Sequence, residues 1–197
     1  MLHTFVVYVE DKPGVLNRVS SLFRRRAYNI ESLAVGHTGQ PGVSRMTIVV
    51  DAADSSVARR IEANLYKLVN VLRVDDVTNK DAVVREMALV KVRAKRDSRS
   101  EIVQIADIFR ANIVDAAHES LVLEIIGTSE KVDRLISMLE QFDIISVQRT
   151  GLIAMLRGDK NVSPDPPLVA ATFKGNQGRE LGDETRQLWR SNTLPKM

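Results

Sequence analysis

The first eighty residues alternate between strand-like and helix-like hydrophobic patterns. Residues 3–10 (HTFVVYVE) are rich in β-branched and aromatic side chains, which predicts a strand. After residues 11–14 (DKPG), apolar positions recur at helical spacing and predict one face of a helix: Val15, Leu16, Val19, Leu22 and Phe23. Asp11 is the predicted N-cap of this helix, and a first turn tolerates Pro13 because its missing N–H has no intrahelical partner.

A hairpin, a second helix and a fourth strand follow. Residues 29–37 and 44–51 are predicted strands, and the short turn at 38–42 (TGQPG) makes them hairpin partners. Residues 69–78 are the fourth predicted strand. Between the hairpin and this strand, a second helix face is predicted from apolar spacing: Val57, Ile61, Leu65 and Leu68. The predicted order is βαββαβ.

The same order recurs in the second half of the chain. Residues 86–94, 112–117, 121–126 and 144–148 are predicted strands. Two helices are predicted from apolar spacing: Ile102, Ile105, Ala106 and Phe109 mark one, and Val132, Leu135, Ile136 and Leu139 the other. The exit from each first helix carries a related Phe-Arg…Asn-Ile sequence, at 23–30 and at 109–113, which supports a duplication.

These patterns predict an α+β protein made of two tandem ferredoxin-like βαββαβ units. We expect the first domain at residues 1–79, the second at 80–160 and a tail at 161–197. The tail contains a stiff SPDPP break at 163–167 and a polar, glycine-containing end, and we expect it to be disordered. A unit of about 70–80 residues is marginally stable alone, which favours pairing of units.

Composition narrows the class of protein. No cysteine is present, so thiolate metal sites are excluded and a reducing, cytoplasmic location is expected. No run of about 18 apolar residues predicts a membrane span. The net charge of +3 arises from 28 basic and 25 acidic residues that are interspersed. We therefore expect no nucleic-acid partner. The cluster at Arg24–Arg26 is expected to complement the end of the first helix.

No catalytic motif or metal-ligand spacing occurs in the sequence. The three histidines (His3, His37 and His118) lie in or beside predicted strands without metal-ligand spacing. Glu10 and Asp11 are adjacent, and neighbouring side chains of a strand point to opposite faces, so they do not form an acid–base pair. We expect no catalytic residue, no metal and no cofactor in this chain.

Residues 11–16 (DKPGVL), between the first strand and the first helix, suggest a ligand site. Gly14 lets a ligand approach the backbone, and the first-turn amides near Val15 and Leu16 favour a carboxylate. Asp11 is suited to an ammonium group, and Asn29 can both donate and accept. An α-amino acid carries both of these charged groups, although Asp-x-Pro-Gly is also a common turn.

This strand–DKPGVL–helix arrangement resembles the ACT domain, a module that binds amino acids. A longer set of segments resembles the acetolactate synthase small subunit family over about residues 1–160. The matching segments are 14–18 (GVLNR), 22–23 (LF), 28–33 (YNIESL), 44–48 (SRMTI), 67–69 (KLV), 71–74 (VLRV), 85–86 (RE), 89–92 (LVKV), 127–128 (GT) and 156–159 (LRGD). Residues 163–197 depart from the compact bacterial pattern.

The resemblance implies a regulatory subunit in branched-chain amino acid biosynthesis. Its partner would be a catalytic large subunit that holds ThDP, Mg²⁺ and FAD. The regulatory subunit would activate this large subunit and make it sensitive to feedback inhibition by valine, in some cases by leucine or isoleucine. It further implies a homodimer of ACT domains with the effector at their interface. The implied contacts in this sequence are Asp11, Gly14, Val15, Leu16, Asn29 and Ile30. Some relatives carry an amide at the position of Asp11.

Two alternative functions remain. A recognisable DNA-binding helix-turn-helix would favour a free-standing ACT-type sensor acting on transcription or another enzyme, and the sequence shows none. An RNA-binding module would need aromatic residues exposed on its central strands. Only Phe5 and Tyr8 qualify, and they are expected on opposite faces.

In the second unit, the turn at residues 95–100 (KRDSRS) has no glycine, so we expect that unit to serve assembly or to respond to another signal.

Overall fold

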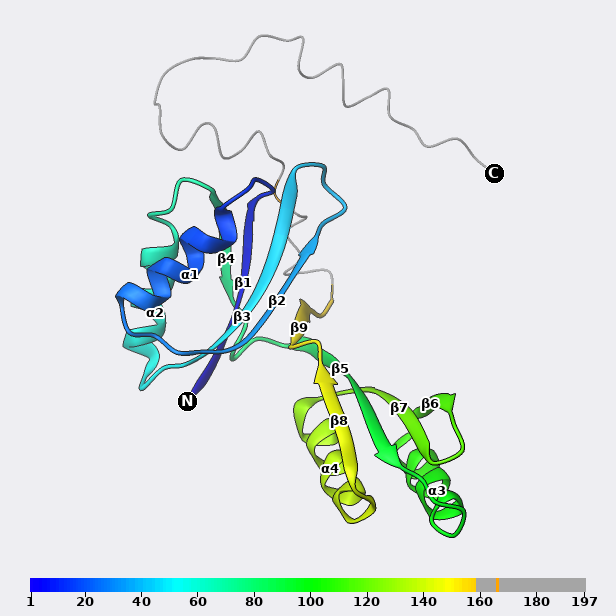
Figure 1. Cartoon of the computed structure of the whole chain (residues 1–197). Coiled ribbons are helices and arrows are strands. Elements are labelled where there is room, and N and C mark those ends of the chain that lie inside the picture. The colour runs from blue at the N-terminus through cyan, green and yellow to red at the C-terminus, as the bar shows by residue number, and fades with distance from the viewer. Residues whose placement is uncertain (159–165, 167–197) are drawn as a thin grey trace, which may run out of the picture.

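The first half of the chain folds into a four-stranded antiparallel sheet with two helices on one face (Figure 1). The computed structural model describes residues 1–158 and residue 166. The strand order is β2-β3-β1-β4, and α1 and α2 form the helical layer. The bounds are β1 Leu2–Glu10, α1 Val15–Arg25, β2 Ile30–His37, β3 Val43–Asp51, α2 Ser55–Leu65 and β4 Val71–Asp76.

The core of this unit lies between sheet and helices, as the alternating pattern predicts. Phe5, Val7 and Val9 of β1 point toward the helices and are at most 1% exposed. Four residues of α1 pack against them: Val15, Val19, Leu22 and Phe23. Tyr8 lies in a different cluster from Phe5, which confirms that the two aromatic side chains face opposite sides of the sheet.

The second half repeats the architecture. The strand order is β6-β7-β5-β8, the topological equivalent of the first sheet, and α3 and α4 contribute to a second core. The bounds are β5 Ala82–Arg93, α3 Arg99–Phe109, β6 Asn112–Ala116, β7 Ser120–Gly127, α4 Ser129–Leu139, a 3₁₀ turn at Glu140–Phe142 and β8 Ile144–Arg149. The prediction of two tandem βαββαβ units in an α+β fold is confirmed.

A two-stranded ribbon joins the units. The beginning of β5, at 82–85, pairs antiparallel with β9 (Ile153–Leu156), beyond the reach of β7 and β8. Ala154, Val84 and Leu156 pack under the helix-free face of the first sheet, against Val6 and Tyr8. Arg45 of β3 also donates a hydrogen bond to the carbonyl of Ala154. The ribbon therefore gives the first sheet a cover on its second face.

Several expectations about element bounds were wrong. Strand β4 covers only Val71–Asp76 of the strand predicted at 69–78. The strand predicted at 144–148 is not the last one, because β9 follows it. Strand β5 begins at Ala82 and not at residue 86, because its first residues pair with β9. Helix α2 ends at Leu65, and Leu68 packs against the core from the turn that follows. Arg99 and Ser100 already belong to α3.

Some predictions fall outside what the structure tests. Apart from residue 166, the tail beyond residue 160 lies outside the described residues. The domain boundaries at 79 and 160 stay predictions. In the described part of the chain, no helix combines the length and the apolar composition needed to cross a membrane.

Candidate functional site

The loop between β1 and α1 is shaped by Gly14. This residue is the N-cap of α1 with φ +83°, a left-handed conformation that glycine adopts without steric strain. A Cβ added here would meet nothing within 4 Å, so the space above the loop is open. The prediction that Asp11 caps the helix is wrong, because α1 begins only at Val15 and carries no side-chain cap.

The first turn of α1 offers backbone N–H groups to solvent. The Val15 N–H donates to the carbonyl of Lys12 at 3.3 Å and is not free, contrary to expectation. The Arg18 N–H donates to Gly14 at 3.0 Å. Between them, the amides of Leu16 and Asn17 have no carbonyl partner within the described chain, as first-turn amides of helices generally lack one. Together with the helix dipole, these two amides favour a bound carboxylate.

The predicted site residues in the loop differ in exposure. Val15 is 4% exposed, and its side chain belongs to the core rather than to a ligand surface. Leu16 is 42% exposed and lies on the open side of the helix. Only the backbone of Val15 can therefore border a ligand, whereas the Leu16 side chain can contact one directly.

Asp11 ties the loop to the end of β2. Its carboxylate lies 3.2 Å from Nδ1 of His37, the last residue of β2, and both side chains are exposed. Its backbone N–H donates to the carbonyl of Gly42 at 2.8 Å. The carboxylate is thus held beside the loop, where it can meet an ammonium group.

Hydrogen bonds and an ion pair join polar side chains of the end of β1, the loop, α1 and the turn before β4 into one cluster. Glu10 accepts hydrogen bonds from Asn70 and Lys12, and Arg18 donates to Asn70 at 2.7 Å. Burial alone would raise the pKa of Glu10, but these hydrogen bonds and the charges of Lys12 and Arg18 outweigh it and hold the pKa below its usual value. Sequence reasoning missed this cluster, since Asn70 lies 60 residues from Glu10 and only the fold brings them together.

Asn29 and Ile30 lie at the other end of α1. The chain leaves α1 at Arg25, and Asn29 precedes β2. Ile30 is the first residue of β2, the strand whose far end meets Asp11 (Figure 1). An 11-residue helix is about 16 Å long at 1.5 Å per residue, longer than a small amino acid. A single chain therefore keeps Asn29 apart from Asp11 and Gly14, and the expected site at an interface between two chains stays a prediction.

Asn29 is exposed and donates through its Nδ2 to the carboxylate of Glu31. Its amide oxygen is left as an acceptor that no donor of the described residues satisfies. Ile30 is half-buried and packs against the first core. We call Asp11, Gly14 and Leu16 the loop half-site, and Asn29 and Ile30 the strand half-site.

Within the described residues, no group of three or more His, Asp or Glu side chains could hold a metal ion. Glu10 and Asp11 serve different partners, Asn70 and His37, and do not form a pair. A βαββαβ unit with a glycine loop leading into its first helix is typical of an ACT domain. Residues 5–73 match the model of the AHAS small subunit-like ACT domain.

The second unit matches a model described as the small subunit of acetolactate synthase, over residues 85–158. An acetolactate synthase small subunit of Mycolicibacterium smegmatis is 46% identical over 160 residues, covering 81% of this chain and 94% of the relative. A probable acetolactate synthase small subunit of Archaeoglobus fulgidus is equally identical and is covered to 99%. The chain belongs to the acetolactate synthase small subunit family, which confirms the predicted class of a regulatory, non-catalytic subunit.

A solved structure agrees with this assignment. The crystal structure of the acetolactate synthase small subunit from Thermotoga maritima superposes with a TM-score of 0.75 at 39% sequence identity. The alignment covers 81% of this chain and 99% of the other. Both units of the present fold are therefore shared with that protein.

Proposed function

We propose that this chain forms a homodimer that binds valine at two equivalent sites, and that this dimer activates and feedback-inhibits a catalytic acetolactate synthase large subunit. The observation that carries the proposal is the separation of the half-sites by α1, with the loop half-site fixed beside the end of β2 by the Asp11–His37 contact. Neither half-site is sufficient alone.

The edge strand β2 offers a way to join the half-sites. It pairs with β3 on one side, and its other side is the edge of the sheet. Antiparallel pairing of β2 with β2 of a second copy would set the start of one strand beside the end of the other. The loop half-site of one chain would then meet the strand half-site of its partner, twice per two-fold dimer.

The chemistry of the two half-sites suits an α-amino acid. The amides of Leu16 and Asn17 would receive the carboxylate, and Asp11 would hold the ammonium group. The partner copy would supply the amide oxygen at position 29 as a further acceptor and an isoleucine at position 30 as apolar surface. A branched aliphatic side chain such as that of valine fits this combination.

The catalytic large subunit is proposed as the partner because the chain belongs to the small subunit family. The large subunit would carry ThDP, Mg²⁺ and FAD and all of the chemistry, while this chain contributes regulation in the cytoplasm. No observation favours the alternative of a free-standing sensor, and the family match extends through the second unit.

The test uses two variants that damage different half-sites. Gly14→Asp places a negative charge where the carboxylate of valine belongs. At about 4 Å and an effective dielectric of 20, the repulsion is roughly 4 kcal/mol, which weakens binding about a thousandfold. Asn29→His adds bulk to the strand half-site. Each variant alone should activate the large subunit and ignore valine.

The decisive experiment mixes the two variant chains. A mixed dimer contains one site with both changes and one site with neither, so co-refolding the two variants should restore part of the valine inhibition. If each site lay within one chain, the mixture would stay insensitive. Loss of activation together with inhibition in both variants would mean that the loop is an assembly surface.

A further inference from the structure

Strand β2 is irregular immediately beside the strand half-site. Its register against β3 shifts between Ile30, which faces Val50, and Ser32, which faces Val49. Glu31 is the extra residue of this bulge, and it is also the acceptor for Asn29. Bulges bend a strand locally and re-aim its side chains. A ligand that contacts Asn29 and Ile30 therefore acts on the part of β2 where the ladder is interrupted.

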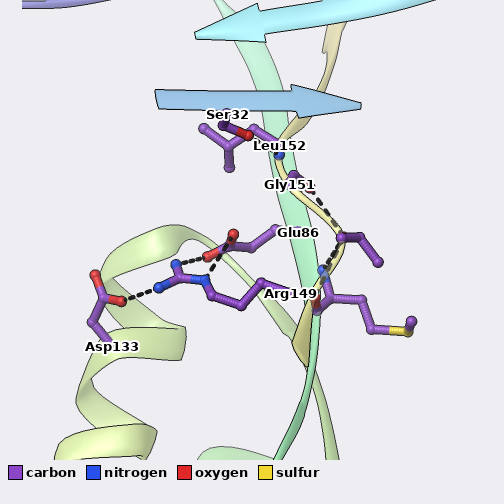
Figure 2. A network of polar contacts seen from close by, with 8 residues as sticks. Ser32, Glu86, Asp133, Arg149, Gly151 and Leu152 are labelled. Carbon is purple, nitrogen blue, oxygen red and sulfur yellow. Dashed lines mark hydrogen bonds and ion pairs between the residues drawn. The ribbon is translucent and has the colours of Figure 1, made fainter. Parts of the chain in front are cut away.

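Ser32, the next residue, contacts the second unit. Its Oγ accepts a hydrogen bond from the Leu152 N–H at 3.1 Å (Figure 2). Gly151 has φ +81°, and a Cβ at this position would lie 2.8 Å from Ser32 Oγ and 3.4 Å from the carbonyl oxygen of Leu33. Glycine is required here both by the backbone conformation and by the close approach of β2.

The residues just before Gly151 are fixed to the body of the second unit. The Thr150 N–H donates to the Met87 carbonyl at 3.0 Å, and the Met87 N–H donates to the Thr150 hydroxyl at 3.1 Å. Arg149 donates to both carboxylate oxygens of Glu86 and, at 2.7 Å, to Asp133 of α4 (Figure 2).

This attachment is stiff because its central carboxylate is buried. Glu86 is 5% exposed, and a buried carboxylate is stable only while its charge partner stays in place. Four consecutive residues, 149–152, therefore link α4 and β5 on one side to β2 on the other. A movement of the bulge in β2 would reach the second unit through Ser32 and Gly151.

We propose that the Ser32–Gly151 contact is the element through which valine bound at the strand half-site repositions the second unit and inhibits the large subunit. This inference rests on the proposed function. Ser32 and Gly151 are positioning residues that transmit the bound state and do not touch the amino acid. Coupling of this kind requires that the bound and free states differ in free energy at the contact, and the bulge is the part of β2 that we expect a bound ligand to displace.

The test replaces Gly151 by alanine and uses Gly158→Ala as a matched control. Gly158 also has positive φ, +68°, but a Cβ there would meet nothing within 4 Å. Both variants carry the same kind of backbone strain, and only Gly151→Ala disturbs Ser32. Three quantities are measured: valine binding by thermal shift of the small subunit, activation of the large subunit without valine, and residual holoenzyme activity at saturating valine.

We expect Gly151→Ala to bind valine and to activate the large subunit like Gly158→Ala, but to be inhibited much less. Allosteric coupling is typically about 5- to 150-fold, and this factor should fall toward one. The double variant Ser32→Ala/Gly151→Ala removes the Oγ that the new methyl group meets, so its inhibition should return to the weakened level of Ser32→Ala alone. Ser32→Ala alone removes the acceptor for Leu152 and should weaken inhibition in a chain with no backbone strain.

Full inhibition of both Gly151→Ala and Ser32→Ala would overturn the proposal. Loss of valine binding in Gly151→Ala would also overturn it, because the residue would then belong to the binding site. If the wild-type protein itself neither binds valine nor confers inhibition, the proposed function fails instead, and the two failures are thereby distinguished.

Discussion

At the scale of single residues, two glycines with nearly the same backbone conformation have different surroundings. Gly14, at φ +83°, opens onto free space, so alanine there would add mainly the strain of a left-handed residue, about 1–2 kcal/mol. Gly151, at φ +81°, would additionally place a methyl group against Ser32. The first glycine leaves room for a ligand, and the second leaves room for another part of the same chain.

The residue-scale prediction concerns Glu10, whose pKa is lowered by the hydrogen bonds of Asn70 and Lys12 against the raising effect of burial. A carboxyl whose pKa is lower in the folded than in the unfolded state stabilises the fold above its unfolded pKa, near 4.5, and this stabilisation is lost as the pH falls through the folded pKa. Glu10→Gln should lower the free energy of unfolding at pH 7 by about 1 kcal/mol. Urea titrations should show this difference shrinking below pH 4.5. A difference independent of pH would contradict the assignment.

At the scale of elements, β2 combines three features in eight residues. It begins at the strand half-site, carries the bulge and Ser32 in its first half, and ends at His37 beside the loop half-site. It is also the edge of the sheet, with Val35 47% exposed. An apolar edge of this kind is a template for pairing with another strand. Dimerisation and effector binding would therefore depend on the same element.

The element-scale prediction tests whether the edge strand β2 forms the dimer interface. Val35→Glu should weaken dimerisation about tenfold or more, because the dimer would bury two copies of the charge and each 1.4 kcal/mol corresponds to a factor of ten. Val69→Glu is the matched control, since Val69 is 85% exposed and lies in the turn between α2 and β4, away from β2. Sedimentation velocity over a concentration series measures both. Equal dimerisation of the two variants would place the interface elsewhere.

At the scale of the whole molecule, the two units have the same topology and different loops. The first unit enters its first helix through Gly14, whereas the second enters α3 through a turn at 95–98 with Ser98 as N-cap and no glycine. A bulky turn gives a ligand less access to the backbone amides. Amino acid binding is therefore expected in the first unit alone, with the second unit held to it by the β5–β9 ribbon.

The corresponding prediction is a thermal shift of the whole chain. Valine at one hundred times its dissociation constant should stabilise the native state by about 2.7 kcal/mol per site, which raises the melting temperature by a measurable amount. Leucine and isoleucine test the specificity for the side chain. Gly14→Asp should remove the shift, although the second unit is unchanged. A shift that survives this substitution would mean that valine binds outside the loop half-site.

Local patterns determined the elements and the duplication. The β-branched and aromatic run at 3–10 predicted β1, and helical spacing predicted the face of α1 that the structure buries, except for Leu16, which is 42% exposed. The DKPGVL loop likewise marked Gly14, the residue that the structure holds at positive φ. The family resemblance rested on these same residues, and the comparisons confirm it.

Only the tertiary structure decided what depends on contacts between distant segments. Strand β9 pairs with the start of β5 about seventy residues earlier, and its short apolar run LIAML has no alternation that predicts a strand. Asp11 pairs with His37 rather than capping α1, and α1 separates the loop half-site from the strand half-site within one chain. The reason is physical: a local period specifies a face, whereas the pairing of distant segments is set by how complete units pack.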